Sequence, residues 1–338
     1  MPPYRVTQEH AKSFARGMFS DNGKKNVERL LRIFDNADIE GRHLCVPFEW
    51  SRPEHTFAYK NSLYVDAAVE LCAKAARRAI DRANVAPGEI GAIVFASTTG
   101  ISTPSIDSKL VFELGLPHDV RRVPVWGLGC AAGAGGLGLS AELAHARPGR
   151  PVLLVAVELC SYTYQRDDLS KANLISSAIF ADGAGAVLLG FDGDGPRVLG
   201  GHSTTWPDTE DIMGWEIVEK GMKVRLSRSL PDFLERAMLE TLVAACEAHG
   251  VRPEQVAHYL THPGGPKVLD AVARVFGVER SALDLSRSVM RDFGNMSSVT
   301  VLFILQRFLE EALYSPGDLA LMSAMGPGFS CEHVFLSC

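Results

Sequence analysis

The residues best suited to covalent chemistry lie in residues 121–143, where Cys130 stands at a glycine-rich corner. Val123 and Val125 predict a short buried strand before the corner, and the alanines and glycines after it predict a tightly packed helix. A cysteine in the first turn of such a helix meets unpaired N–H groups and the positive end of the helix dipole, which favour the thiolate. Cys130 is therefore a candidate nucleophile. Most free cysteines are small buried apolar residues, and this stretch alone does not decide between the two interpretations.

Landmarks in the second half of the chain repeat those of the first half at an almost constant offset. The matching landmarks are Val85, Pro87 and Ile90 with Val251, Pro253 and Val256; Gly129 and Cys130 with Gly294 and Asn295; and Pro148 and Gly149 with Pro316 and Gly317. Such a repeat predicts a duplicated β-α-β-α-β unit whose halves pack about a pseudo-twofold axis. The equivalent corners then meet near the axis, which places Cys130 close to Asn295.

The same symmetry directs the turn that contains His262 into the shared centre. His262 follows a predicted strand that begins near His258, and the Pro-Gly-Gly after it forms a rigid turn that fixes its side chain. An isolated turn histidine is more often a structural residue, which is the interpretation we keep for His258 and His145. The sequence therefore predicts a cluster of one cysteine, one histidine and one asparagine.

A cluster of Cys130, His262 and Asn295 suits carbon–carbon bond formation by decarboxylative condensation. Cys130 would hold an acyl group as a thioester, with His262 as the base that keeps the sulfur a thiolate. The Asn295 amide cannot act as a base, but it can donate a hydrogen bond to an oxyanion, as a histidine can. Its alternative role is a helix N-cap, and the two roles are compatible. Two donors around one thiol fit the enolate that forms when a malonyl thioester loses carbon dioxide.

The composition describes an ordinary globular protein and excludes several functional classes. The 338 residues are 46% hydrophobic, which suffices for a large core in one double-sized domain or two intimate halves. The net charge of −6 argues against a nucleic-acid binder, which is normally basic. The first residues lack the apolar core of a signal peptide and no run could span a membrane, so we expect a cytoplasmic protein without stable membrane insertion. Seven widely spaced cysteines predict reduced thiols and no metal site.

A basic stripe lies near the start of the chain. Residues 7–35 predict two helices broken at residues 20–23, and the second helix carries Lys25, Arg29 and Arg32 along one face. Such a stripe is usually a solvated surface. Its functional alternative is a clamp for a phosphate-bearing ligand, because cations spaced along one face can meet a diphosphate.

The remaining elements follow from hydrophobic patterns. The sequence predicts a strong helix over 63–83, buried strands over 92–97 and 151–157, and a glycine-rich corner into another strand over 176–190. Residues 193–213 are rich in Gly, Pro, Asp and Thr and form the best candidate boundary. We therefore predict an N-terminal half over residues 1–200, which carries the cysteine, and a C-terminal half over 201–338, which carries the histidine and asparagine.

Five motifs, in their order along the chain, resemble the type III polyketide synthases, the chalcone-synthase-like branch of the thiolase superfamily. They are GLGCAAGAGGL, AIFADGAGAVLLG, THPGGPKVLD, FGNMSSVTVLFIL and AMGPGFS, and the resemblance runs from about residue 25 to the end. It implies an α/β, thiolase-like five-layered αβαβα fold built from two pseudo-twofold-related β-α-β-α-β halves. Carried over by position, Cys130 is the acyl-accepting nucleophile, and His262 and Asn295 activate the sulfur and stabilise the malonyl-derived enolate.

The resemblance also implies residues that bind substrate. Phe180 matches the aromatic gate between the coenzyme A tunnel and the cavity, with plain core packing as its alternative. Arg29 and Arg32 loosely match basic residues that bind coenzyme A in the family. Thr103 matches the loop residue that closes the partner's cavity in family homodimers, and Val224 is nearest to the second gate phenylalanine of plant enzymes. Thr98 and Ser297 complete the predicted substrate site.

These matches predict an enzyme that uses acyl-CoA and malonyl-CoA, needs no cofactor, and acts as a homodimer. Plant members usually carry methionine where this chain has Thr103, so two smaller wall residues suggest a cavity shaped for something other than a bulky phenylpropanoid. The short N-terminus and the stretch GWEIVEKGMKVRLSRSLP resemble bacterial members that make alkylpyrones or alkylresorcinols from long-chain acyl starters.

Two alternatives stay open at this point. An initiating ketoacyl-carrier-protein synthase shares the Cys–His–Asn set and makes a single condensation, but that family follows its histidine with Gln-Ala-Asn, where this chain has Pro263, Gly264 and Gly265. The second alternative is a catalytically inactive scaffold that only pairs with partner synthases. A live site would be alkylated by iodoacetamide selectively at Cys130 and protected by acyl-CoA.

Overall fold

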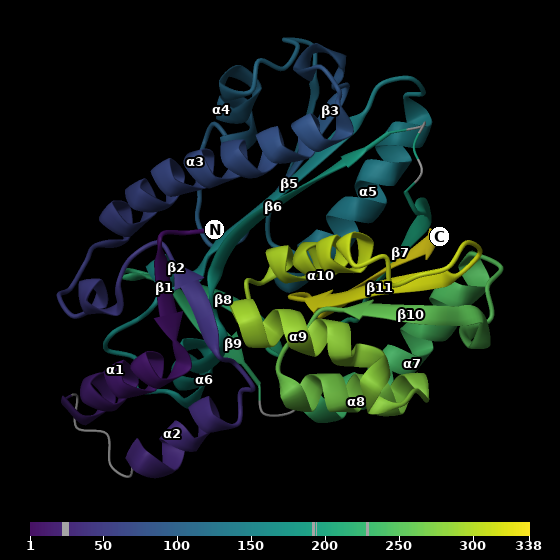
Figure 1. Ribbon diagram of the computed structural model, residues 1–338. Helices are drawn as coiled ribbons and strands as arrows, with labels where there is room; N and C mark the ends of the chain where they lie inside the picture. The colour runs from purple at the N-terminus through teal and green to yellow at the C-terminus, as the bar shows by residue number, and fades with distance from the viewer. Residues whose placement is uncertain (22–26, 191–192, 194, 228–229) are drawn as a thin grey trace.

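Two four-stranded sheets form the frame of the molecule, and layers of helices cover and separate them (Figure 1). The computed structural model describes residues 1–21, 27–190, 193, 195–227 and 230–338. Across the first sheet the strands are β4 (Arg121–Val125), β3 (Ala92–Ala96), β5 (Val152–Leu159) and β6 (Asp182–Leu189). Across the second they are β10 (Val256–Thr261), β11 (Leu319–Gly326), β12 (Ser330–Ser337) and β7 (Arg197–Thr205).

Three pairs of helices supply the helical layers, which gives the αβαβα order that the sequence predicts. The pairs are α3 (Phe57–Ala83) and α4 (Ile106–Glu113) outside the first sheet, α5 (Ala132–Ala146) and α10 (Ser298–Glu310) between the sheets, and α7 (Leu230–Ala248) and α8 (Pro266–Phe276) outside the second. In Figure 1, α5 and α10 lie between the teal and the yellow-green sheets.

The central strands of the first sheet are buried on both faces. β3 is parallel to β4 and β5, and the antiparallel strand β6 completes the sheet. Along β3, Ile93 and Phe95 pack into the core under α3, whereas Val94 packs into the core between the sheets. All eight residues of β5 are buried, which explains the continuous apolar run and confirms the predicted strand.

The internal repeat has a structural counterpart in each half. A 3₁₀ turn at Pro87–Glu89 leads into β3, and an equivalent turn at Pro253–Gln255 leads into β10. The halves differ before their central helices, because β4 precedes the cysteine corner whereas the helix α9 (Asp284–Phe293) precedes Gly294.

Strand β4 departs from the prediction of a buried strand. Val123 and Val125 are only half-buried, and the other residues of β4 are exposed. The cause is the position of β4 at the edge of the sheet, where β3 is its one neighbour among the described strands. An edge position also accommodates Pro124, which has no N–H to donate to a neighbouring strand.

A third group of elements packs beside the first sheet. It comprises β1 (Tyr4–Thr7) paired with β2 (Gly41–Leu44), the helices α1 (Gln8–Asp21), α2 (Val27–Asp35) and α6 (Lys171–Ile179), and the hairpin of β8 (Met213–Val218) and β9 (Gly221–Leu226). α1 and α2 are the two helices predicted over residues 7–35, and they share a core cluster with α6. None of the helices in the described ranges is long and apolar enough to cross a membrane.

The glycines of α5 let its backbone approach its neighbours closely, as their number predicts. A Cβ on Gly133 would lie 2.1 Å from the carbonyl oxygen of Ser298, at the start of α10. A Cβ on Gly326, at the end of β11, would lie 2.1 Å from the carbonyl oxygen of Leu128. At these two places α10 and β11, both from the second half of the chain, pack directly against the segment around Cys130.

We expect Gly133→Ala to lower the free energy of unfolding by about 2 kcal/mol, within the range of roughly 1–3 kcal/mol for overpacking. Alanine favours helix over glycine by at most about 1 kcal/mol, which cannot offset a clash with a backbone oxygen. Urea unfolding measures the change. Gly88→Ala is the matched control, since a Cβ there meets nothing within 4 Å. An unchanged midpoint for Gly133→Ala would show that the two central helices can move apart at little cost.

Candidate active site

Cys130 lies in a 3₁₀ turn (Gly129–Ala131) that leads from β4 into α5. The residue is 8% exposed, and its Sγ lies 3.3 Å from the hydroxyl oxygen of Ser297. Behind the turn, the hydroxyl of Thr98 accepts a hydrogen bond from the backbone N–H of Gly129 at 3.0 Å. The thiol is therefore held between the end of β3 and the start of α10.

Asn295 and Ser297 form the equivalent corner of the second half, between α9 and α10. The side-chain oxygen of Asn295 accepts a hydrogen bond from the backbone N–H of Ser297 at 2.8 Å. Ser297 has φ +50°, a left-handed conformation that is uncommon for a serine, and its hydroxyl meets the thiol. The structure thus brings Cys130, Ser297 and Asn295 together. Within the described residues, the Asn295 amide nitrogen has no acceptor and stays available as a donor.

His262 continues β10 beside β11, with its backbone N–H donating to the carbonyl of Ser323 at 2.8 Å. The residue is 2% exposed, and neither ring nitrogen has a hydrogen-bond partner among the described residues. The end of β11 packs at Gly326 onto the turn that carries Cys130, and His262 lies at the end of β10, the strand paired with β11. The hydrogen-bond partner of the thiol is Ser297 and not His262.

Burial sets the protonation of both groups. It raises the pKa of the Cys130 thiol to about 12, although the Ser297 hydroxyl pulls that pKa down. Burial also lowers the pKa of His262 to about 4. At neutral pH the site therefore holds a thiol and a neutral imidazole. Burial therefore opposes the resting thiolate that the helix N-terminus favours.

Glu158, at the end of β5, is a buried carboxyl group beside the candidate site that the sequence analysis did not identify. Its carboxylate is fully buried and accepts hydrogen bonds from the Thr98 backbone N–H at 3.1 Å, the Thr99 hydroxyl at 2.9 Å and the Ser298 hydroxyl at 2.8 Å. It thereby ties the loop after β3 to the first turn of α10, on both sides of the thiol. The one available signal was a single acidic residue inside the apolar run VLLVAVELC.

Glu158→Gln should remove a pH-dependent part of the stability. Burial raises the pKa of Glu158 from 4.5 to about 7, so the folded state prefers the neutral acid. Its stabilising contribution is complete below pH 4.5 and is lost as the pH rises through about 7. The stability of the wild type relative to Glu158→Gln should therefore fall by on the order of 3 kcal/mol across this window. Urea unfolding of both proteins at several pH values measures it, with Glu240→Gln, on the exposed face of α7, as control; a constant difference contradicts the prediction.

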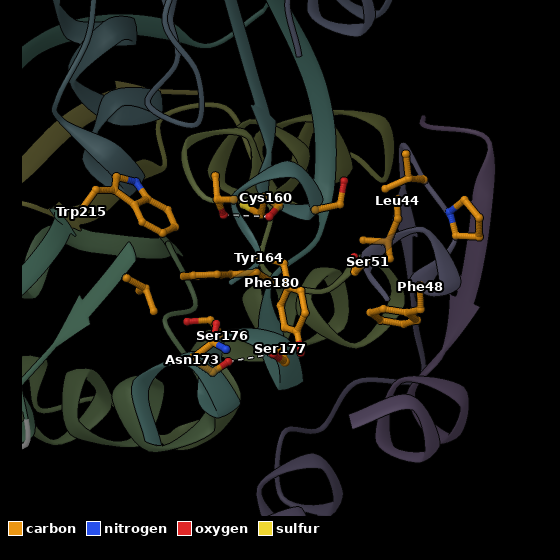
Figure 2. Close-up of a pocket in the computed structure, with 15 residues that line it drawn as sticks. Leu44, Phe48, Ser51, Cys160, Tyr164, Asn173, Ser176, Ser177, Phe180 and Trp215 are labelled. Carbon is orange, nitrogen blue, oxygen red and sulfur yellow. Dashed lines mark hydrogen bonds between the residues drawn. The ribbon is translucent and has the colours of Figure 1, made fainter. Parts of the chain in front are cut away.

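An apolar cavity lies among β2, α6 and the hairpin of β8 and β9 (Figure 2). Its empty volume, including space open to solvent, is about 550 Å³. The walls include Leu44, Val46, Phe48, Cys160, Tyr164, Phe180, Trp215 and Val224. Cys130, His262 and Asn295 do not line it, but Cys130 lies close enough to contribute to the raised pKa of Cys160.

Phe180 separates the cavity from the corner that carries Asn295. The backbone on either side of Phe180 is paired with Asn295, through Ala181 N–H to the Asn295 carbonyl and Asn295 N–H to the Ile179 carbonyl, both at 2.8 Å. The Phe180 ring lies 6.4 Å from the Trp215 ring, centroid to centroid. Val224, the other predicted gate position, lines the same cavity.

The other predicted substrate-binding residues lie away from the thiol. Arg29 and Arg32 are exposed on α2 and make no ion pair with any residue that the structure describes. Lys25, the third member of the basic stripe, lies outside the described residues. Thr103 is exposed in the loop before α4. No group of three or more His, Cys, Asp or Glu side chains in the described ranges is placed to hold a metal ion.

Comparisons with known proteins agree on one family. The model of the chalcone and stilbene synthase N-terminal domain matches residues 1–193, and that of the C-terminal domain matches residues 200–338. A putative chalcone synthase of Bacillus subtilis is 35% identical, over 100% of this chain and 96% of its own length. The 1,3,6,8-tetrahydroxynaphthalene synthase of Streptomyces peucetius is 35% identical over 99% of this chain and 90% of its own. The crystal structure of the Streptomyces coelicolor 1,3,6,8-tetrahydroxynaphthalene synthase, a bacterial type III polyketide synthase, has a TM-score of 0.95 and 29% identity, covering 99% of this chain and 96% of that one.

Proposed function

The chain belongs to the chalcone and stilbene synthase family of type III polyketide synthases, and we propose that it condenses malonyl-CoA with a long-chain acyl-CoA starter. The product is an alkylpyrone or an alkylresorcinol, and no cofactor takes part. The observation that carries this proposal is the apolar cavity lined by Phe180 and Val224, the two predicted gate positions, because such a cavity suits an alkyl chain.

In the loading step, Cys130 Sγ attacks the carbonyl carbon of the acyl-CoA. The thiol proton passes to a ring nitrogen of His262, which is neutral and without a partner in the described part of the chain. The tetrahedral intermediate collapses, the coenzyme A thiolate leaves, and it takes up the proton from His262. The starter is then a thioester on Cys130.

In the condensation step, malonyl-CoA loses carbon dioxide and leaves an enolate of acetyl-CoA. The negative oxygen of the enolate accepts hydrogen bonds from the Asn295 amide and from His262 in its N–H tautomer. The enolate carbon attacks the thioester carbonyl, the bond from that carbon to Cys130 Sγ breaks, and the expelled thiolate takes up a proton from solvent water. The chain is then two carbons longer and carried by coenzyme A, ready to return to Cys130 or to cyclise.

The cavity walls favour long starters. Leu44, Val46, Phe48 and Trp215 present apolar surface, and each CH₂ that they bury contributes about 0.8 kcal/mol. KM for the starter should therefore fall about fourfold per CH₂ until the cavity is filled. Incubation of the purified protein with malonyl-CoA and a series of acyl-CoA starters, with mass spectrometry of the products, tests this.

The same experiment separates the competing functions. Formation of 1,3,6,8-tetrahydroxynaphthalene from malonyl-CoA alone would reject the long-chain starter in favour of the activity that the Streptomyces peucetius relative is named for. A single condensation that requires an acyl carrier protein would support the ketoacyl synthase alternative. If neither carbon dioxide nor any product formed with any starter, the remaining hypothesis would be a catalytically inactive scaffold.

We also propose that the chain forms a homodimer through the loop that contains Thr103. Ile101 and Trp126 expose large apolar side chains, and the Trp126 indole N–H donates to the Gly100 carbonyl of this loop at 3.1 Å. Covering such side chains on a partner stabilises an interface. Light scattering coupled to gel filtration measures the mass in solution, and Trp126→Glu is expected to shift it from dimer to monomer.

A further inference from the structure

Lys60, on α3, is a buried cation that forms no ion pair with any carboxylate in the described part of the chain. The residue is 7% exposed, and its ammonium makes one hydrogen bond within the described chain, to the Tyr164 carbonyl at 3.3 Å. Burial and the nearby charge of Lys220 both lower its pKa. An ammonium has three donors, so two remain for a ligand. A cation in the first turn of a helix is also disfavoured by the helix dipole, so the stability of α3 does not explain this lysine.

Lys60 lines a polar hollow of about 360 Å³, including space open to solvent. The other charged side chains around this hollow are paired with one another. Lys220 binds Glu54 at 2.7 Å and Asp167 at 3.0 Å, and Arg166 binds Asp167 at 2.8 Å. The lining thus contains three cations and two carboxylates. The unbalanced positive charge is that of Lys60, and a buried unbalanced charge favours the binding of an anion.

The polar hollow adjoins the apolar cavity. Ser51 and Tyr164 line both, and the ammonium of Lys60 contacts the backbone of Tyr164. A third, smaller space connects Lys60 with Thr99, whose hydroxyl binds Glu158 behind the reaction centre. An acyl chain in the apolar cavity that extends past Ser51 and Tyr164 therefore enters the polar hollow that Lys60 lines.

We propose that Lys60 forms an anion subsite that takes the terminal carboxylate of an acyl chain held in the apolar cavity. The substrate class is an ω-carboxyacyl-CoA, favoured over a methyl-ended acyl-CoA of the same length. The inference rests on the proposed function, since it refines the starter that the cavity accepts. A charge-assisted hydrogen bond from a buried ammonium discriminates between the two chain ends by about tenfold to a hundredfold.

The test compares the affinities of ω-carboxyacyl-CoA and methyl-ended acyl-CoA of matched length by calorimetry. It uses the full chain with Cys130→Ala, so that binding is measured without turnover. For the chain length that spans the cavity, the ratio of the two affinities should fall about tenfold to a hundredfold in Lys60→Met and Lys60→Gln, and persist in Lys60→Arg. Lys74→Met on the same helix is the control, because Lys74 is exposed and paired with Glu70.

Each outcome decides the point. A ratio that does not change in Lys60→Met and Lys60→Gln overturns the inference, provided urea unfolding shows both variants folded. The inference would also be overturned if free acetate bound as tightly as the ω-carboxyacyl-CoA and lost this binding in the Lys60 variants. The subsite would then take a separate anion and not the end of the acyl chain. If the affinity ratio depends on Lys60 but the wild type makes no product from either starter, the inference stands and the proposed function fails.

Discussion

Cys130→Ala is expected to abolish product formation, with a fall in kcat of about 10⁴-fold or more, as removal of a covalent nucleophile typically gives. Among the described residues, the Cys130 thiol has its hydrogen-bond partner in Ser297, in the turn that leads into α5. Product formation from acyl-CoA and malonyl-CoA, followed by mass spectrometry, measures the loss. Residual activity within tenfold of the wild type would reject Cys130 as the nucleophile.

The matched control is Cys331→Ala. Cys331 is another fully buried thiol, but it lies in β12 against Met238 and His333, in the core under α7. Its replacement should lower the stability and leave kcat unchanged. Iodoacetamide adds a second readout, since it should modify Cys130 in the native protein and leave Cys331 unmodified, and a long-chain acyl-CoA should slow the reaction at Cys130.

The sequence predicted the frame of the site because that frame depends on the backbone. The internal repeat predicted that the corners at Cys130 and Asn295 meet, and the structure links them through Ser297. The glycines of α5 predicted a close approach, which the distance between Gly133 and Ser298 explains. Spacing and glycine content carry such information, because they decide where the chain can turn and how near two helices can come.

The sequence could not predict the properties that arise from burial. The pKa values of Cys130 and His262 depend on how much protein surrounds them, and a helix N-terminus seen in isolation gives the opposite sign for the thiol. Glu158 is a single acidic residue in an apolar run and Lys60 is one of several polar residues near the start of α3, so no periodicity identifies either of them. Their importance depends on their neighbours in the fold: Glu158 has three hydrogen-bond donors around it, and Lys60 has no carboxylate partner among the described residues.

His262→Ala should lower the rate of acyl loading at neutral pH by about 10²–10⁴-fold, the usual contribution of a general base. Burial raises the pKa of the Cys130 thiol to about 12 and lowers that of His262 to about 4, and in the proposed mechanism His262 takes the thiol proton as the carbon–sulfur bond forms. Condensation should suffer as well, because the enolate loses one of its two hydrogen-bond donors.

The pH profile distinguishes this role from a structural one. Wild-type loading should be nearly independent of pH above about 4, where His262 is neutral and able to accept a proton. In His262→Ala the reactive species is the small fraction of thiolate, which grows tenfold per pH unit until the pH reaches about 12. A plot of the logarithm of the loading rate of this variant against pH should therefore rise with a slope of one. Single-turnover loading of a radiolabelled acyl-CoA measures both profiles, and a variant whose rate is low but as flat as that of the wild type would show that the imidazole supports the site without moving the proton.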